Sequence, residues 1–211
     1  MSALADFYDL LLPELPGIST AMVDLHLREV ALDFCTKTSA WREDLTVINL
    51  VAEQGTYTVA TPASSELVRI TELTVAGELL WRLSDRTEGR QTTATTPKYA
   101  PNQPPFTLSA DLTQLTLLEV PTAAVVGGLV ISAALKPTVA ATTLPDFLKA
   151  QHSEAIRHGV LSRLMAMGRK PWTDRDLAMV YDALWNGAVN FAAYQATVGN
   201  TREPLRTKKW G

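Results

Sequence analysis

The stretch that decides the fold is LDFCTKTSAWREDL, residues 32–45, in which a helical pattern gives way to a β-rich one. Before it, apolar residues recur at the spacing of one helical face, which predicts a helix that Ser19 or Thr20 caps. After it, β-branched and aromatic residues dominate, as is typical of strands. The apolar residues of the predicted helical face are Val23, Leu27, Val30, Ala31 and Phe34.

Cys35, the only cysteine of the chain, is interpreted as a packing residue and not as a nucleophile. It lies near the C-terminal end of the predicted helix, where the helix dipole disfavours a thiolate. No histidine is close to it in the sequence, and free cysteine is among the residue types that are most often buried. A single cysteine forms no internal disulfide, so nothing here requires an oxidising compartment.

On either side of this stretch, the chain divides into segments with different sequence patterns. Residues 1–42 and 143–199 are predicted to be helical and to pack as a bundle, with a first short helix over residues 3–12. Residues 45–140 are predicted to form an inserted, mostly antiparallel β module. Helices at both ends of a β insert favour the α+β fold class.

The strongest helical pattern belongs to the last helix, which Thr173 is expected to cap and Gly199 to end. Its apolar residues recur three and four apart, so Trp185 and Phe191 are expected to be buried on one inward face. The full apolar set of this helix is Leu177, Val180, Tyr181, Leu184, Trp185, Ala188, Phe191 and Ala192.

Two segments fall outside the packed zones. Residues 84–105 hold five threonines and four prolines with little to bury, so this long arm is expected to be flexible in the free subunit and ordered by a neighbour. Residues 200–211 are expected to form an extended tail with four cations and one carboxylate, so the charge of −3 divides into +3 for the tail and −6 for the rest. An acidic body with a basic tail argues against nucleic acid wrapped around the whole surface. It favours a tail that binds a partner.

No arrangement of residues in the sequence indicates catalysis, a cofactor or a metal. Phosphate-binding glycine loops and the Gly-x-Ser-x-Gly motif are absent. His152 and His158 are six residues apart, on different faces of a helix, so they are expected to be surface or interface histidines. The protein is therefore expected not to be an enzyme and to need no cofactor.

The sequence also predicts no membrane association. The longest apolar run, residues 123–135, has 13 residues, fewer than the ~18–20 that a membrane-spanning helix needs. The N-terminal residues carry two aspartates and no basic region, unlike a signal peptide. A soluble protein made in the cytoplasm is expected.

Small residues inside two predicted helices indicate close helix packing. Glycine in the middle of a helix costs about 1 kcal/mol relative to alanine, which suggests a compensating contact at Gly159, four residues after Ala155, and at Gly187, next to Ala188. Packing within the core remains open for both pairs. The sharper alternative, which we take as the prediction, is that these four residues form contacts between subunits.

Several of these features occur together in a particular order. A short helix and a Pro-Gly turn precede the helix with Phe34-Cys35, and Trp41-Arg42 follow it; the β module opens with Val51, Gly55 and Tyr57. The pattern HxxAIxxGVLxxL begins at His152, and Pro171-Trp172 follow it. In this order and spacing, over most of its length, the chain resembles the head-to-tail adaptor proteins of tailed bacteriophages, also called connector or tail tubular A-type proteins.

The resemblance implies a structural protein of the virion neck that is synthesised in the host cytoplasm. It implies a homo-oligomeric ring of about a dozen copies, a dodecamer, between the portal protein and the tail or nozzle protein. Such a ring continues the DNA channel and lets DNA pass without specific recognition. The basic tail would then dock on the portal, because arginine and tryptophan often dominate interface energies. The proposed docking residues are Arg202, Arg206, Lys208, Lys209 and Trp210.

Two other functions remain open from the residues alone. The β zone could belong to a carbohydrate- or peptide-binding accessory module that presents Tyr99 and Phe106 on the long loop. The third hypothesis is an enzyme of an unrecognised type, but the sequence contains no cluster of catalytic residues that supports it. The oligomeric state separates the first two readings, because an accessory module can be monomeric whereas an adaptor must form a ring.

Overall fold

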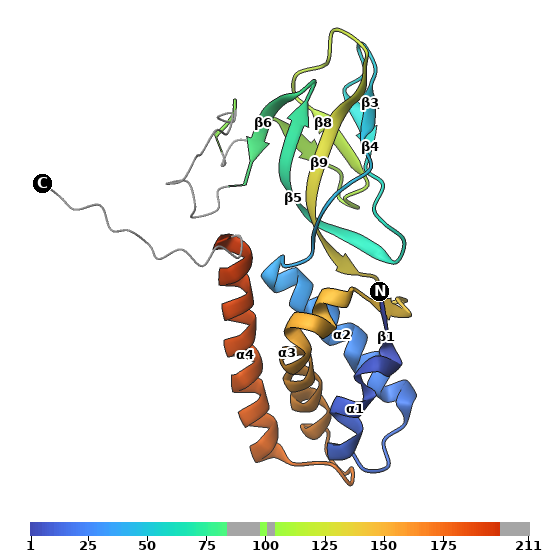
Figure 1. The fold of residues 1–211 in the computed structure, drawn as a ribbon, viewed down its shortest axis with the longest axis vertical. Coiled ribbons are helices and arrows are strands. Elements are labelled where there is room, and N and C mark those ends of the chain that lie inside the picture. The colour runs from blue at the N-terminus through green and yellow to red at the C-terminus, as the bar shows by residue number, and fades with distance from the viewer. Residues whose placement is uncertain (84–97, 101–103, 199–211) are drawn as a thin grey trace, which may run out of the picture.

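The computed structural model describes residues 1–83, 98–100 and 104–198. Within these ranges the fold is α+β, as the sequence predicted. The helices gather at one end of an elongated molecule and most strands gather at the other end (Figure 1). The predicted tail, residues 200–211, and most of the predicted arm, residues 84–105, lie outside the described residues.

The helical end is a bundle whose three long helices run alternately up, down and up (Figure 1). Each of these helices turns one apolar row inward, where it contacts the other two, and the first short helix packs against the second long one. The bundle therefore joins residues from both ends of the chain, as predicted. Its helices are α1 (Tyr8–Leu11), α2 (Thr20–Thr38), α3 (Asp146–Met165) and α4 (Arg175–Val198).

The helix predicted over residues 3–12 is broken into shorter pieces. Strand β1 (Ser2–Ala3) leads into a 3-10 turn, α1 and a second 3-10 turn that ends at Glu14. A helix this short gains too few hydrogen bonds to fix its own geometry. Packing fixes it instead, because Phe7, Leu11 and Leu15 are almost completely buried.

The start of α4 also differs from the prediction. The side chain of Asp174, and not that of Thr173, caps the helix, since its Oδ1 accepts the backbone N–H of Leu177 at 3.0 Å. The Thr173 hydroxyl oxygen accepts the backbone N–H of Lys170 at 2.9 Å, which closes the loop between α3 and α4. Both residue types are good caps, so the loop geometry decides between them.

The β module consists of two antiparallel sheets. In the larger sheet the order is β2-β9-β5-β6, with β3 also paired to β9, and in the smaller sheet the order is β4-β8-β7. The two longest strands, β5 and β9, pair along most of their length and form the centre of the larger sheet. The strands are β2 (Arg42–Asp44), β3 (Ile48–Leu50), β4 (Thr56–Thr58), β5 (Ser65–Val75), β6 (Glu78–Arg82), β7 (Phe106–Leu108), β8 (Gln114–Leu117) and β9 (Val125–Pro137).

Residues 32–45 form the junction between the bundle and the β module. Helix α2 ends at Thr38. Its cap residue Ser39 has a positive φ of 51°, which turns the chain, and the Ser39 N–H donates to the Cys35 carbonyl at 2.9 Å. The chain then enters β2, where Arg42 pairs with Ala134 of β9. A second link is β10 (Thr143–Leu144), which pairs with β1 just before α3 begins. One continuous apolar core runs through both ends of the molecule.

Candidate assembly surface

The outer face of α4 carries a row of apolar residues that the rest of the described chain leaves uncovered. The row follows the spacing 4, 3, 4, 3, which keeps its members on one face of a helix. Its four large side chains are about half exposed or more, and its centre is Gly187. We call this row the α4 outer stripe; it consists of Val180, Leu184, Gly187, Phe191 and Tyr194.

The opposite face of α4 packs against α2 and α3. Trp185 is only 4% exposed, as predicted, and its ring centroid lies 5.9 Å from that of Phe34 in α2. The prediction for Phe191 is wrong, because 62% of this residue is exposed. The reason is that α4 is apolar on both faces, so periodicity alone does not say which face turns inward. The face that turns inward is formed by Ala178, Trp185, Val189 and Ala192.

The two pairs of small residues occupy different surroundings. A Cβ atom built on Gly159 would lie 2.7 Å from both Trp185 and Val30, and Ala155 is buried as well. At Ala155 and Gly159 the prediction of a contact between subunits is therefore wrong, because the chain's own α2 and α4 occupy that space. Gly187 is exposed, with nothing within 4 Å of a built Cβ, and Ala188 is half-buried. For that second pair, subunit packing stays a prediction.

The electrostatic character of the α4 outer stripe is close to neutral. Asp182 is the only charged residue between positions 177 and 198, and its offset of two residues from Val180 and Leu184 places it off the stripe. Asp176, four residues before Val180, extends the stripe toward the start of the helix and is exposed. The uncharged part of this face, from Val180 to Tyr194, is about four turns long, which is unusual for a helix surface that stays in water.

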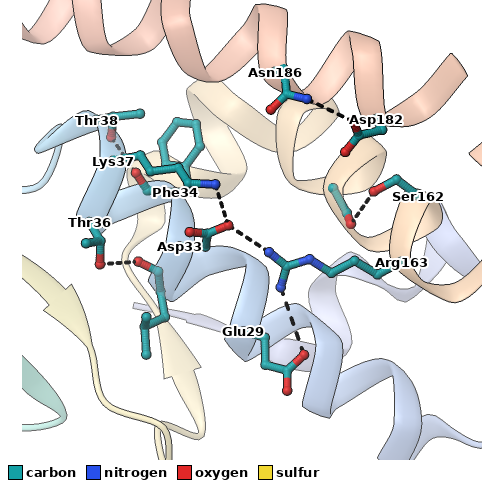
Figure 2. A network of polar contacts seen from close by, with 12 residues as sticks. Glu29, Asp33, Phe34, Thr36, Lys37, Thr38, Ser162, Arg163, Asp182 and Asn186 are labelled. Carbon is teal, nitrogen blue, oxygen red and sulfur yellow. Dashed lines mark hydrogen bonds and ion pairs between the residues drawn. The ribbon is translucent and has the colours of Figure 1, made fainter. Parts of the chain in front are cut away.

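By contrast, the polar groups between α2 and α3 are satisfied within the chain. Arg163 of α3 donates to Asp33 of α2 at 2.8 Å and lies 3.9 Å from Glu29, and Lys37 also donates to Asp33, as Figure 2 shows. These four side chains hold the two helices in register. The network is a structural link, because each charge in it already faces an opposite charge.

A second polar cluster attaches the N-terminal segment to the bundle. The Glu14 carboxylate accepts the hydroxyl of Tyr181 at 2.5 Å and a guanidinium N–H of Arg157. Arg157 also donates to the Leu10 carbonyl at 3.2 Å. The ring of His158 stacks on Tyr181 with centroids 5.6 Å apart. The cluster therefore joins three parts of the bundle that are far apart in the sequence.

The candidates for chemistry do not assemble into a site. Cys35 is completely buried, and burial raises the pKa of its thiol to about 12, so it packs as predicted. His152 and His158, expected at the surface or at an interface, are half-buried in α3. Burial lowers the pKa of both imidazoles, and the nearby Arg157 lowers the pKa of His158 further. Within the described ranges no three His, Cys, Asp or Glu residues are grouped as metal ligands.

A cleft of about 520 Å³ lies where the bundle meets the β module. Its two carboxylates are already engaged: Glu43 accepts the indole N–H of Trp41 at 2.8 Å, and Asp146 accepts the hydroxyl of Ser2 at 2.8 Å. Hydrogen bonds from the N-terminal ammonium group and from Ser2 lower the pKa of Asp146. Both carboxylates therefore act as acceptors that hold the junction together.

The two aromatic residues expected on the long loop are placed differently from each other. Phe106 is buried in β7, with its ring edge-on to Trp81 at 5.3 Å, so it is not presented to a ligand as expected. Tyr99 is half-buried, and its backbone N–H donates to Leu80 of β6 at 3.0 Å. Its hydroxyl donates to Glu119. This end of the arm is therefore attached to the sheet.

The five predicted docking residues of the tail lie outside the described residues. None of the helices in the described ranges combines the length and the apolar character that a membrane crossing requires. The four large apolar side chains of the α4 outer stripe, by contrast, are described and exposed. No model of a known protein family matches the chain, and a comparison with curated proteins finds no similar sequence.

Proposed function

We propose that this chain is a structural virion protein, the head-to-tail adaptor that forms a ring between the portal and the tail of a bacteriophage. The observation that carries the proposal is the α4 outer stripe. A helix that is apolar on both faces is typical of a buried helix, and large exposed apolar patches mark protein–protein contacts. The order of motifs described above supplies the kind of assembly.

A closed ring requires each subunit to offer two different and complementary flanks. The α4 outer stripe supports one such flank, because it is apolar, regular and long. The elongated shape of the subunit, with helices at one end and sheets at the other (Figure 1), suits a ring in which long axes stand side by side. Such a ring would present one end of each subunit to the portal and the other end to the tail protein.

The charge of the chain is compatible with a DNA conduit. The chain carries a net charge of −3. Because residues 200–211 carry +3, the rest of the chain carries −6. A negatively charged channel wall repels the phosphate backbone and does not bind it, so a duplex slides past without specific recognition. The adaptor would therefore need no DNA-binding motif.

Electron microscopy of the purified protein, alone and mixed with the portal protein of the same virus, tests the proposal. A closed ring of about a dozen copies that sits coaxially on the portal is the expected result. A protein that remains monomeric in the presence of the portal would refute it. A monomer that binds a glycan or a peptide through its β module would support the accessory-module reading instead.

The docking role of the tail is tested by deleting residues 200–211. The deletion should leave the melting temperature nearly unchanged and abolish association with the portal. Trp210→Ala and a charge-neutral tail, with glutamine at Arg202, Arg206, Lys208 and Lys209, separate the apolar anchor from electrostatic steering. Portal binding of normal strength after the deletion would mean that another surface docks.

A further inference from the structure

Helix α2 carries a second partly apolar row on its outer side. Its members are spaced by 4, 3 and 4 residues, so they share one face. Leu25 is 45% exposed, Ala21 is exposed, and Arg28 and Leu32 are half-buried. We call this row the α2 outer stripe; it consists of Ala21, Leu25, Arg28 and Leu32.

The two outer stripes face away from each other. Helices α2 and α4 meet through their inward rows, since the rings of Phe34 and Trp185 lie 5.9 Å apart. Val30 and Trp185 also converge on the same glycine, Gly159. Each outer stripe lies on the side of its helix that turns away from this contact. The bundle therefore has apolar residues on two different flanks.

The two stripes also lie at the same height in the bundle. Helices α2 and α4 run in the same general direction (Figure 1), and the contact of Phe34 with Trp185 sets their register. At a rise of 1.5 Å per residue, Leu32 lies about 3 Å below Phe34 and Leu184 about 1.5 Å below Trp185. A rotation about an axis parallel to the bundle keeps these heights, so it brings Leu184 of one copy level with Leu32 of the next.

Two opposite charges match in the same register. Arg28 lies about 9 Å below Phe34 and Asp176 about 13.5 Å below Trp185, a difference that an arginine side chain spans. The Arg28 side chain donates to the Asp24 carbonyl of its own helix at 3.1 Å. Neither Arg28 nor Asp176 has an ion-pair partner among the described residues.

We propose that the α4 outer stripe of one copy docks on the α2 outer stripe of the next copy, with Asp176 paired to Arg28 across the contact. The contact is heterologous, because each subunit uses a different flank on each side, and repetition of it generates a ring or an open polymer. That the repetition closes into a ring rests on the proposed adaptor function. The centre of the contact is Gly187, where the absence of a side chain allows close approach.

Two other occupants fit the α4 outer stripe less well. The chain's own tail brings four cations, but the stripe has no carboxylate after Asp176 to receive them. A twofold pairing of α4 with α4 covers this stripe but leaves Leu25 of α2 in water. Only the heterologous contact covers both stripes and pairs the two charges.

Cysteine cross-linking of mixed variants tests the contact. Leu184→Cys and Leu32→Cys are purified separately, mixed and oxidised; a disulfide-linked dimer should form in the mixture and in neither variant alone. Buried Cys35 should stay unreactive in the wild-type protein, which is the first control. The second control is Met179→Cys, which is even more exposed on α4 (65% against 47% for Leu184) but lies off the stripe, and it should give no dimer with Leu32→Cys.

Charge reversal provides an independent arm. Asp176→Lys and Arg28→Glu should each raise the concentration for half-assembly about five- to tenfold, and the double variant should return it to within about twofold of wild type. Each variant changes an incompletely buried side chain, so its melting temperature as a monomer should fall by only a few degrees, which includes the helix-dipole interaction that Asp176 loses in the first turn of α4. Single variants that assemble like the wild type would remove the ion pair from the proposal.

The outcomes separate the contact from the adaptor function. A dimer of Leu184→Cys with itself would show a twofold contact and overturn the inference, as would a closed wild-type ring without cross-links in the mixture. In the second case the adaptor function would survive. Specific cross-links in the mixture together with open filaments of the wild-type protein would support the contact and refute the adaptor ring.

Discussion

At the scale of single residues, two aromatic side chains of α4 show what the fold requires. Trp185 and Phe191 are less than two turns apart and both are large and apolar, yet one is 4% exposed and the other 62%. Trp185 fills the space between α2 and α3, whereas Phe191 contributes little to the isolated subunit. On this helix, the position of an aromatic residue, and not its type, therefore decides whether it stabilises the fold or is available for assembly.

Replacing these two residues by alanine should have opposite consequences. Trp185→Ala leaves a cavity in the bundle and should lower the free energy of unfolding by about 3–5 kcal/mol. Phe191→Ala removes an exposed ring and should change it by no more than about 0.5 kcal/mol. Urea unfolding of dilute, monomeric protein measures both values. An equal effect of the two substitutions would mean that α4 is rotated from the phase described above.

The two helix glycines provide a second matched pair. Gly159→Ala places a methyl group 2.7 Å from Trp185 and Val30, so overpacking should cost about 1–3 kcal/mol despite the better helix propensity of alanine. Gly187→Ala meets nothing within 4 Å and should stabilise the monomer by up to about 1 kcal/mol. Thermal unfolding of both variants measures the difference. Stabilisation by Gly159→Ala would show that α3 is not closely packed there.

At the scale of elements, α3 contains an irregular residue that packs against aromatic neighbours. It departs from helical geometry at His152, whose ring lies 4.8 Å from that of Phe34 and 5.9 Å from that of Phe147. Burial removes water from this imidazole and so disfavours its charged form. The start of α3 is therefore a place where protonation opposes folding.

The stability of the protein should fall as the pH is lowered from 8 to about 5.5. Burial lowers the pKa of His152 below its ordinary value of 6.5 in the folded state. The neutral form is thus favoured by folding, and its contribution is complete above pH 6.5 and lost as the pH falls. His158 acts in the same direction. Denaturant unfolding across this range should show a shallower pH dependence for His152→Gln, and an unchanged slope would contradict the assignment.

The N-terminal segment depends on the bundle in a similar way. Glu14→Ala leaves Arg157 without its best-buried partner and Tyr181 without an acceptor, and it should cost about 1–3 kcal/mol. Glu154→Ala is the control, because Glu154 also pairs with Arg157 but its side chain is 64% exposed; it should cost at most about 0.5 kcal/mol. Urea unfolding measures the cost of each substitution. Equal costs would mean that the contacts of Glu14 stabilise the protein no more than the exposed ion pair of Glu154.

At the scale of the whole molecule, the bundle and the β module share one apolar core. The junction at residues 32–45 and the pairing of β1 with β10 give the two ends two separate links. Neither end can open without exposing core residues of the other. The molecule is therefore expected to unfold as one unit.

This expectation is tested by following unfolding with two probes. The signal of Trp81 reports the β module and that of Trp185 reports the bundle, so each single-tryptophan variant that keeps one or the other should lose its fluorescence signal and its far-ultraviolet circular dichroism at the same urea concentration. The comparison is made within each variant, because the variant without Trp185 is less stable. A fluorescence midpoint that differs from the circular-dichroism midpoint of the same variant would show two independently unfolding units. Wild-type fluorescence at several emission wavelengths serves as the control for the substitutions.

The sequence by itself determined the elements with strong local signals. The periodicity of α2, the β-branched runs after Leu45 and the α+β order follow from side-chain patterns that act within a few residues. The burial of Cys35 followed from its position near the end of a helix and from the ordinary behaviour of that residue type. These features need no knowledge of what lies across the core.

Tertiary structure decided the features that depend on which neighbours meet. The phase of α4 could not be predicted, because apolar residues cover both of its faces and only contact with α2 and α3 selects Trp185 over Phe191. The need for glycine at position 159 likewise depends on Trp185, which belongs to another helix and packs against this position. The α4 outer stripe could be identified only from the tertiary structure, because it consists of the residues of α4 that the packed core leaves exposed.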